Sequence, residues 1–205
     1  MSEPVKLSVI YYSATGTGAA IAREIAETAE KEGAQVRLRR AAELAPAEAI
    51  AGNPAWAANV EATADIAEAT ADDVVWADAV IFGSPTRYGN IAAQLKQFID
   101  TLGPQWAQGL LAGKVYSGFT STSTAHGGQE STLLALANSF YHFGGIIVPP
   151  GFTEPSKFAD GNPYGTSHVD AQGNSPVDDQ TRTAAQVQVR RVLRVAAALT
   201  GHTTF

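Results

Sequence analysis

Cysteine is absent from all 205 residues of the chain. Its absence excludes disulfide bonds, thiolate metal sites, iron–sulfur clusters and thiol redox chemistry, so any electron that this protein handles requires a bound cofactor. Positive charge is also scarce, because 14 Lys and Arg residues face 20 Asp and Glu residues and leave a formal net charge of −6. Nucleic acids and anionic membranes select clustered basic residues. Neither is therefore an expected partner.

Long apolar runs and metal-ligand patterns are missing as well. No apolar run approaches the roughly 18 residues of a membrane-spanning helix, and the first residues lack the basic and apolar regions of a secretion signal. We therefore expect a cytoplasmic protein without membrane insertion. The 4 histidines have neither metal-ligand spacing nor evident carboxylate partners in the sequence. No metal site is predicted.

What the chain does contain is a regular alternation of apolar strand-like segments and helix-like segments. Strands are expected at residues 7–12, 35–39, 79–82, 115–119 and 146–148. Helices are expected at residues 19–32, 91–102 and 129–143 and after Pro176. Parallel strands need crossover helices that cover the sheet. The alternation therefore predicts an α/β fold with a doubly wound, five-stranded parallel sheet and helices on both faces.

The length of the chain fits a single domain. With 45% hydrophobic residues, a chain of 205 residues can bury about 70% of the surface that its unfolded form exposes. We expect one domain over residues 1–205, in which residues 41–73 and 149–180 depart from the alternation and form irregular insertions. Loops of this length in a compact domain are usually functional or interfacial.

A glycine-rich turn joins the first expected strand to the first expected helix. Its residues are Ser13, Ala14, Thr15, Gly16, Thr17 and Gly18. A helix start offers unpaired N–H groups and a partial positive charge, so this turn predicts a phosphate site. A nucleotide-triphosphate loop is excluded because no lysine follows Gly18 before Lys31. A dinucleotide loop is weakened by Ile21 and by the arginines within 37–40, but it stays open because arginine can bind a 2′-phosphate.

Two more loops are expected at the same edge of the sheet, after the third and fourth strands. The first contains Pro85, Thr86, Arg87, Tyr88, Gly89 and Asn90. The second contains Ser121, Thr122, Ser123, Thr124, Ala125, His126 and Gly127. An aromatic side chain beside glycines suits a flat ligand, and small hydroxyls and glycines allow the backbone to approach it closely. Because ligands of doubly wound sheets bind at the carboxyl ends of the strands, the three loops predict one site.

Four segments together resemble the WrbA-type NAD(P)H:quinone oxidoreductases, a family of flavodoxin-like FMN proteins. They are Tyr11-Tyr12-Ser13, Phe82 to Asn90, Gly128-Gln129-Glu130 and Val148-Pro149-Pro150-Gly151. The string Pro-Thr-Arg-Tyr-Gly-Asn at 85–90 is the most specific part, because ordinary flavodoxins lack it. The resemblance implies a flavodoxin-like fold, non-covalent FMN, NADH or NADPH as co-substrate, two-electron reduction of quinones, and a homotetramer with its sites near subunit contacts.

The resemblance also implies roles for individual residues. Residues 13–18 would hold the FMN phosphate, residues 85–90 the flavin ring, and residues 121–127 the ring edge and the ribityl chain. Trp106 stands where the family places an aromatic side chain beside the substrate. His142 stands where the family places a histidine next to the flavin, so it is the expected catalytic residue and would help in protonation.

Some positions keep a second interpretation open. Thr15 is assigned to the substrate site, although many relatives have at this position an aromatic residue that contacts the nicotinamide nucleotide. The third loop is one residue longer than in those relatives, around Ala125-His126. Trp106 lies near leucines in the sequence and is also explained as a core residue, and His142 is also explained as a structural histidine.

The expected reaction transfers a hydride from NADH or NADPH to FMN and then two electrons to a quinone in the same pocket, which predicts ping-pong kinetics. The main alternative is a flavodoxin that carries single electrons to a protein partner. A third interpretation is an NADP-binding regulator without enzyme activity. The stretch 149–180, the region of Trp106 and the loop 85–90 favour the enzyme, because they suit a walled pocket.

Overall fold

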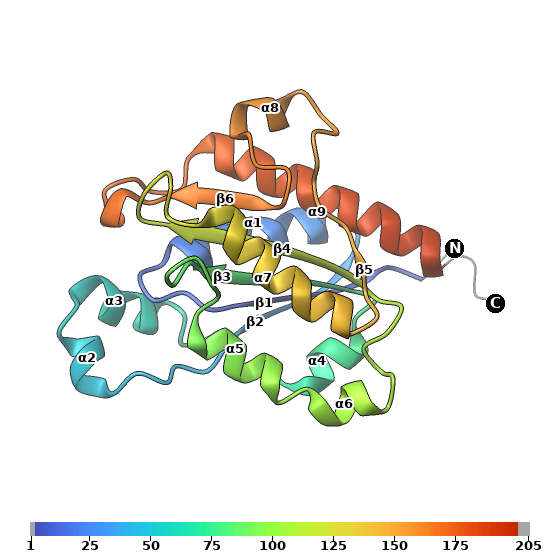
Figure 1. The fold of residues 1–205 in the computed structure, drawn as a ribbon, viewed down its shortest axis with the longest axis horizontal. Coiled ribbons are helices and arrows are strands. Elements are labelled where there is room, and N and C mark those ends of the chain that lie inside the picture. The colour runs from blue at the N-terminus through green and yellow to red at the C-terminus, as the bar shows by residue number, and fades with distance from the viewer. Residues whose placement is uncertain (1–2, 201–205) are drawn as a thin grey trace.

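The structure is a computed structural model that describes residues 3–200. Five parallel strands form its centre in the spatial order β2-β1-β3-β4-β5 (Figure 1). They are β1 (Lys6–Tyr11), β2 (Gln35–Arg40), β3 (Ala79–Pro85), β4 (Val115–Thr122) and β5 (Ile146–Ile147). Each strand pairs parallel to its neighbours, so the predicted doubly wound α/β sheet is confirmed. The strand order switches between β1 and β3, and such a switch point is where these sheets bind ligands.

A sixth strand, β6 (Thr166–Val169), extends the sheet inside a stretch that was expected to be irregular. It pairs parallel with the carboxyl half of β4, where Phe119 lies opposite Thr166, whereas β5 pairs only with the amino half of β4. The same stretch contains α8 (Ser156–Asp160) and a short 3-10 helix, η1 (Ala171–Gly173). The expectation of five strands missed β6 because a segment of four residues has almost no local periodicity.

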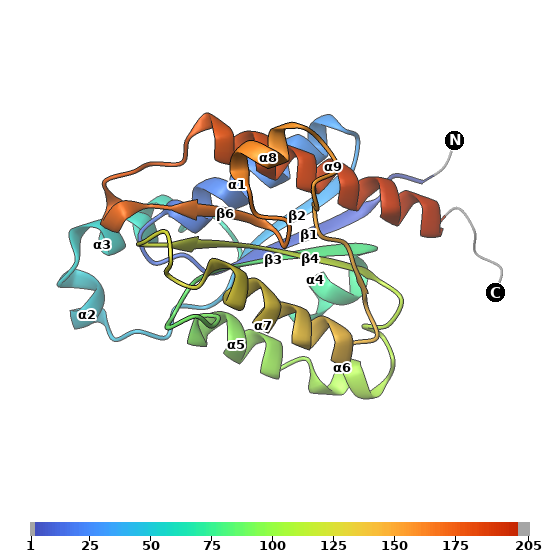
Figure 2. The ribbon, with the colours of Figure 1, turned by 45° about the horizontal axis from the view of Figure 1, so that its top comes forward.

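Helices cover both faces of the sheet. Successive side chains of a strand point to opposite faces, so the apolar side chains of each strand need a cover on both sides. Figure 2 shows α1, α8 and α9 on one side and α4, α5, α6 and α7 on the other. Val9 is buried in one cluster with residues of α1 and α9, whereas its neighbour Ile10 is buried in a second cluster with residues of α4, α5 and α7. The bounds are α1 (Thr17–Lys31), α4 (Ala71–Trp76), α5 (Ala93–Asp100), α6 (Gly103–Ala107), α7 (Gln129–His142) and α9 (Asp179–Thr200).

The stretch 41–73, also expected to be irregular, contains α2 (Ala47–Ala51) and α3 (Pro54–Ala62). The side-chain oxygen of Asn53 accepts hydrogen bonds from two N–H groups of the first turn of α3, at 3.1 and 3.2 Å. The proline that follows fits the first helical position, so an Asn-Pro pair marks the helix start. The alanine-rich sequence conceals both helices, because alanine favours helix without producing an apolar period.

The carboxylate of Glu43 attaches this stretch to the rest of the molecule. It accepts hydrogen bonds from the hydroxyl of Tyr12, the indole N–H of Trp56 and the amide of Gln94, each at 2.9 Å. Burial by itself raises the pKa of the Glu43 carboxyl, but the N–H of Ala45 and these three side chains outweigh burial and hold that pKa below its usual range. The segment that carries α2 and α3 is therefore fixed to the end of β1 and to α5.

The last helix, α9, begins directly after a capping aspartate. The carboxylate of Asp178 accepts a hydrogen bond from the N–H of Thr181 at 2.8 Å, and this bond lowers the pKa of Asp178. Arg182 of this helix pairs with Glu24 of α1 at 3.1 Å, so the two helices are joined on their outer side as well as through the core. Among residues 3–200, no helix has both the length and the apolar composition that crossing a bilayer requires.

Candidate functional site

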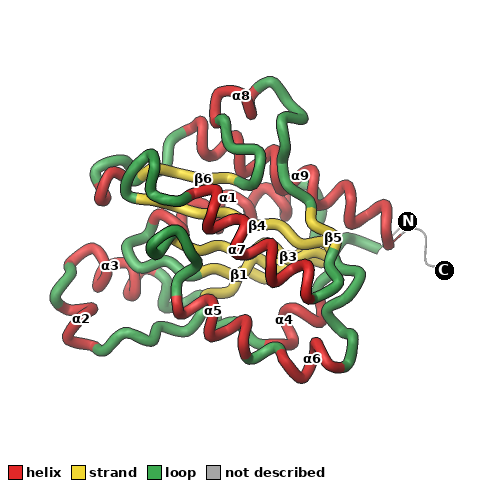
Figure 3. Tube along the Cα trace, viewed as in Figure 1, coloured by secondary structure: helices red, strands yellow, loops and turns green. Residues whose placement is uncertain are grey.

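The turns after β1, β3 and β4 surround a cleft of about 410 Å³ at the carboxyl edge of the sheet. Figure 3 shows loops gathered at this edge, at the end of the molecule away from the N-terminus. The volume lies within the range of about 300–1,000 Å³ that small-molecule sites occupy. The predicted site residues that the structure brings together here are Ser13, Ala14, Thr15, Thr17, Pro85, Thr86, Arg87, Ser121, Thr122 and Ser123.

The turn between β1 and α1 has the geometry of an anion site. Gly16 adopts a left-handed conformation with φ 102°, which a residue without a Cβ takes readily. Its N–H donates to the Ser13 hydroxyl at 3.1 Å, and the amide of Asn59 in α3 donates to the Ser13 carbonyl at 2.8 Å. The N–H groups of the first turn of α1, which begins at Thr17, have no acceptor inside the helix. Together with the helix dipole they can bind an anion.

The loop after β3 ends in a strained two-residue turn. The N–H of Arg87 donates to the carbonyl of Asn90 at 2.7 Å, and the N–H of Asn90 donates back at 3.0 Å. Between them, Tyr88 and Gly89 both have positive φ, 54° and 76°, as a type I′ turn requires. A bulky residue in this conformation is strained, and such strain gathers at functional sites. The strained residue carries a fully exposed aromatic ring.

Thr86 links the second and third loops. Its N–H donates to the carbonyl of Ser121 at 2.8 Å, and its hydroxyl donates to the carbonyl of Gly127 at 3.2 Å. The same hydroxyl accepts from the N–H of Gly89 and from the hydroxyl of Thr132, at 3.2 and 2.9 Å. Both donors of Thr86 are thus engaged within the protein. Donation from Thr86 to a ligand therefore requires one of these bonds to break.

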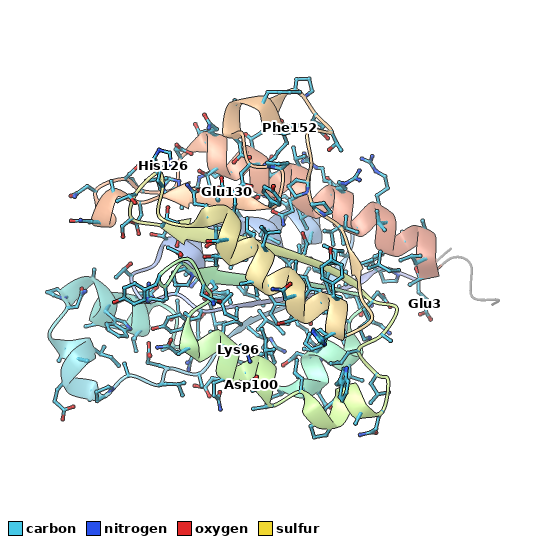
Figure 4. The ribbon with its side chains drawn as sticks, viewed as in Figure 1. Glu3, Lys96, Asp100, His126, Glu130 and Phe152 are labelled. Carbon is cyan, nitrogen blue, oxygen red and sulfur yellow. The ribbon has the colours of Figure 1, made fainter. Side chains whose placement is uncertain are left out.

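The loop after β4 contributes only its first part to the cleft. Ser121 and Thr122 end the strand itself, paired with β3 and β6, and Ser123 follows them. The rest of the loop folds on itself, since the N–H of Gly127 donates to the carbonyl of Thr124 at 3.0 Å. His126 lies at the exposed tip of this loop, as Figure 4 shows. Thr124, Ala125, His126 and Gly127 therefore lie beside the cleft and do not line it.

Two regions line the cleft that sequence reasoning did not assign to it. The start of α3 contributes Asn53 and Ala55, and the segment after β6 contributes Asp170, Gln172 and Gly173. The Asn-Pro pair was a visible signal for the start of α3, but nothing local in the sequence indicated where that helix would lie. For the segment after β6, the only signal was the unusual length of the stretch 149–180.

Trp106 and His142 lie in a second cleft of about 550 Å³ between α5, α6 and α7. The indole N–H of Trp106 donates to the carbonyl of His142 at 2.7 Å, and 55% of the Trp106 side chain is exposed, so the alternative of a core residue is wrong. α7 begins beside the first cleft at Gln129 and ends at His142, a length of about 21 Å for 14 residues. His142 does not line the first cleft, whereas Asn90 of the loop after β3 lines the second one together with His142.

The arginines of β2 are engaged in ion pairs. Arg37 and Arg39 both bond the carboxylate of Asp73, at 3.2 and 3.0 Å. Arg40 pairs with Glu68 at 2.9 Å. None of the three side chains is thus a free group for a 2′-phosphate, and the dinucleotide interpretation becomes weaker still.

Comparison with known proteins decides between the remaining interpretations. A sequence profile described as NADPH-dependent FMN reductase matches residues 5–159. The chain belongs to this family. A relative from Deinococcus radiodurans named NAD(P)H dehydrogenase (quinone) is 46% identical, over 98% of this chain and 100% of its own length. Another of the same name from Aromatoleum aromaticum is 39% identical, over 95% of this chain and 97% of its own length.

A solved structure of the same fold supports this placement. The crystal structure of a flavodoxin, WrbA-like protein from Agrobacterium tumefaciens superposes with a TM-score of 0.64 at 25% identity, over 94% of this chain and 97% of that one. The flavodoxin-like fold implied by the sequence is thereby confirmed. The profile of the NADPH-dependent FMN reductase family covers all three predicted loops, Trp106 and His142, whereas β6 and Asp170 follow the matched residues.

Proposed function

We propose that this protein is an FMN-dependent enzyme that transfers two electrons from NADH or NADPH to quinones. The observation that carries the proposal is the 46% identity, over nearly the whole chain, to a relative named NAD(P)H dehydrogenase (quinone). Membership of the NADPH-dependent FMN reductase family and the polar cleft at the start of α1 support FMN as the cofactor. When bound, FMN supplies a group that can accept a hydride and release two electrons.

The residues of the first turn fit the phosphate of FMN. Residues 13–18 would surround it with hydroxyls and with the free N–H groups at the start of α1. A Cβ at Gly18 would lie 3.1 Å from the carbonyl oxygen of Tyr12, so glycine permits the close packing of this turn. The helix dipole adds about half a positive charge at this point. The turn can therefore hold a phosphate without a lysine.

The second and third loops would orient the flavin ring. Among the residues that line the cleft, Arg87 is the only cation, and it would stabilise negative charge near the ring. Pro85, Tyr88, Gly89 and Asn90 would shape the ring site around it. The ends of β4 would approach the ring edge and the ribityl chain, with Ser121, Thr122, Ser123, Thr124, Ala125, His126 and Gly127 as the predicted residues.

We infer that the substrate pocket is completed by another copy of the chain. Trp106 and His142 do not line the first cleft, and the cleft that they line is separate from it. In a homotetramer with its sites at subunit contacts, they would reach a neighbouring ring. Trp106 and Thr15 would then border the substrate, and His142 would help in protonation. We also propose a cytoplasmic location, which suits an enzyme similar to relatives named NAD(P)H dehydrogenase (quinone).

An absorbance spectrum followed by anaerobic titration tests the proposal. The purified protein should be yellow, NADH or NADPH should bleach it directly to the two-electron-reduced state, and benzoquinone should restore the colour. Initial rates at varied NADH and quinone should give parallel lines, because both substrates use one pocket. A protein that stays colourless with excess FMN would contradict FMN binding. Stable one-electron reduction without bleaching by NAD(P)H would favour the electron carrier instead.

A further inference from the structure

The segment after β6 places a carboxylate at the start of α1. Oδ2 of Asp170 accepts a hydrogen bond from the hydroxyl of Thr17 at 3.3 Å, in the first turn of the helix. The N–H of Asp170 donates to the carbonyl of Thr122 at 2.9 Å, so its backbone is fixed to the end of β4. The carboxylate thus occupies the neighbourhood in which the turn 13–18 offers its donors to an anion.

The segment holds this carboxylate firmly. The N–H of Gln172 donates to Oδ1 of Asp170 at 3.0 Å, and the N–H of Ser175 donates to the Asp170 carbonyl at 2.9 Å. His168 of β6, which is buried, bonds the carbonyl of Ser175 at 2.9 Å. Gln172 has a positive φ of 61°, and such a strained residue persists only where its surroundings hold it in place. Asp170 is therefore an ordered part of the cleft.

The charges around the cleft make this position unusual. Asp170 and Arg87 are the only charged residues that line it. A phosphate monoester carries a charge of about −1.5 to −2 at neutral pH. A carboxylate bonded to Thr17 competes with that phosphate for the hydroxyl and repels it, because like charges at short range disfavour each other. The same carboxylate has little effect on an uncharged group in that place.

We propose that Asp170 is a specificity-determining residue that weakens the binding of the FMN phosphate relative to the uncharged end of riboflavin. The proposal rests on the proposed function, because it assigns the phosphate to residues 13–18. It means that the cofactor is held less tightly than its phosphate site alone would allow, so that FMN exchanges with free FMN in solution.

Asp170→Asn in the full chain tests the proposal. Asparagine removes the charge, while its side-chain oxygen can still accept the N–H of Gln172 and keep the turn. After flavin removal, FMN and riboflavin are titrated by the quenching of flavin fluorescence. The Kd for FMN should fall about tenfold, equivalent to about 1.4 kcal/mol, while the Kd for riboflavin changes by less than about twofold. The difference for FMN should shrink as salt is added.

Asp72→Asn is the matched control. It removes the same charge from an exposed position on α4 that does not line the cleft, so neither Kd should change. If Asp170→Asn does not fold, Asp170→Ser provides an uncharged acceptor for the same turn and takes its place. Equal or weaker FMN binding by the variant, or an equal gain for riboflavin, overturns the proposal. Failure of the wild-type protein to bind FMN contradicts the proposed function itself.

Discussion

The two clefts differ in position and in chemistry, since Ala135 to His142 of α7 help to line the second cleft but not the first. The first is lined by small hydroxyl side chains and by the charges of Arg87 and Asp170. The second, near His142, is lined mainly by larger apolar side chains, among them Ile99, Leu102, Trp106 and Phe143, and by the ion pair of Lys96 with Asp100. The first suits a charged ligand that is held by its phosphate. The second suits an uncharged ring.

This difference suggests that the first cleft binds the cofactor and that the second cleft selects the substrate. Changes in the first cleft should alter FMN affinity, whereas changes in the second should alter the use of quinone by a protein that still binds FMN. The two clefts share no lining residue in the described part of the chain, so each can be changed without touching the other. Variants that affect one task and spare the other test this separation.

Gly16→Ala should have the largest effect on the first cleft. Alanine at φ 102° is strained, and relaxation of that strain moves the N–H groups that face the phosphate. The Kd for FMN should rise about 100-fold, equivalent to about 2.7 kcal/mol. Gly33→Ala is the control, because Gly33 also has a positive φ, of 86°, but lies at the other end of α1. Equal loss of FMN binding in both variants would show that general destabilisation is the cause.

Trp106→Ala should affect the second cleft only. Removal of the indole leaves one wall of that cleft open, and kcat/KM for quinone should fall about tenfold while the Kd for FMN stays within about twofold. Phe158→Ala provides the control, since Phe158 is an exposed aromatic residue that stacks on Phe152 in another region. A loss of FMN binding as large as that of Gly16→Ala would contradict the separation of the two clefts.

The part of the first cleft that is built from residues close together in the sequence could be predicted from local sequence alone. An apolar strand, a turn with Gly16 and an amphipathic helix follow one another at 6–31, so the anion site is encoded within one short segment. Asp170 was not predictable in this way. β6, which carries it to the cleft, pairs with β4 about 47 residues earlier, and such long-range pairing leaves no local pattern.

The second cleft shows a different limit. The helix that contains His142 was predicted with nearly correct bounds, and the rise of 1.5 Å per residue already implied that its two ends are far apart. The family resemblance placed His142 beside the flavin without stating from which copy of the chain. The sequence of one chain contains no signal for the second copy, so the position of His142 beside the flavin stays a prediction.

Glu43→Gln should have a smaller effect that again concerns the first cleft. The Glu43 carboxylate joins α3, and with it Asn59 and the turn 13–18, to the end of β1. Its folded-state pKa lies below the unfolded value of about 4.3. Ionisation therefore stabilises the folded state above about pH 5, and this contribution is lost as the pH falls through the folded-state pKa.

The variant should lose about 1 kcal/mol of unfolding free energy at pH 7, because a hydrogen-bonded charge becomes neutral. The difference from the wild type should shrink as the pH falls through the folded-state pKa, and urea unfolding at pH 7 and at a series of lower pH values measures it. Glu48→Gln, in the same stretch but on the exposed side of α2, should change neither value. A difference that stays constant over the whole series would show that the charge of Glu43 is not its source.

Tyr88→Gly should have the smallest effect on stability and the opposite sign. A non-glycine residue with φ near 54° destabilises the folded state by about 1–2 kcal/mol, and glycine removes this strain. Glycine also has greater freedom in the unfolded chain, which lowers the unfolding free energy by about 0.5–1 kcal/mol. The unfolding free energy should therefore rise by about 0.5 kcal/mol, while the rate with quinone falls several-fold because the exposed ring is gone. Tyr141→Ala removes an exposed ring from a regular helix and should not stabilise. A variant Tyr88→Gly that is less stable than the wild type would contradict this prediction. It would show that the Tyr88 ring makes stabilising contacts, for example with another copy of the chain, that outweigh the backbone strain.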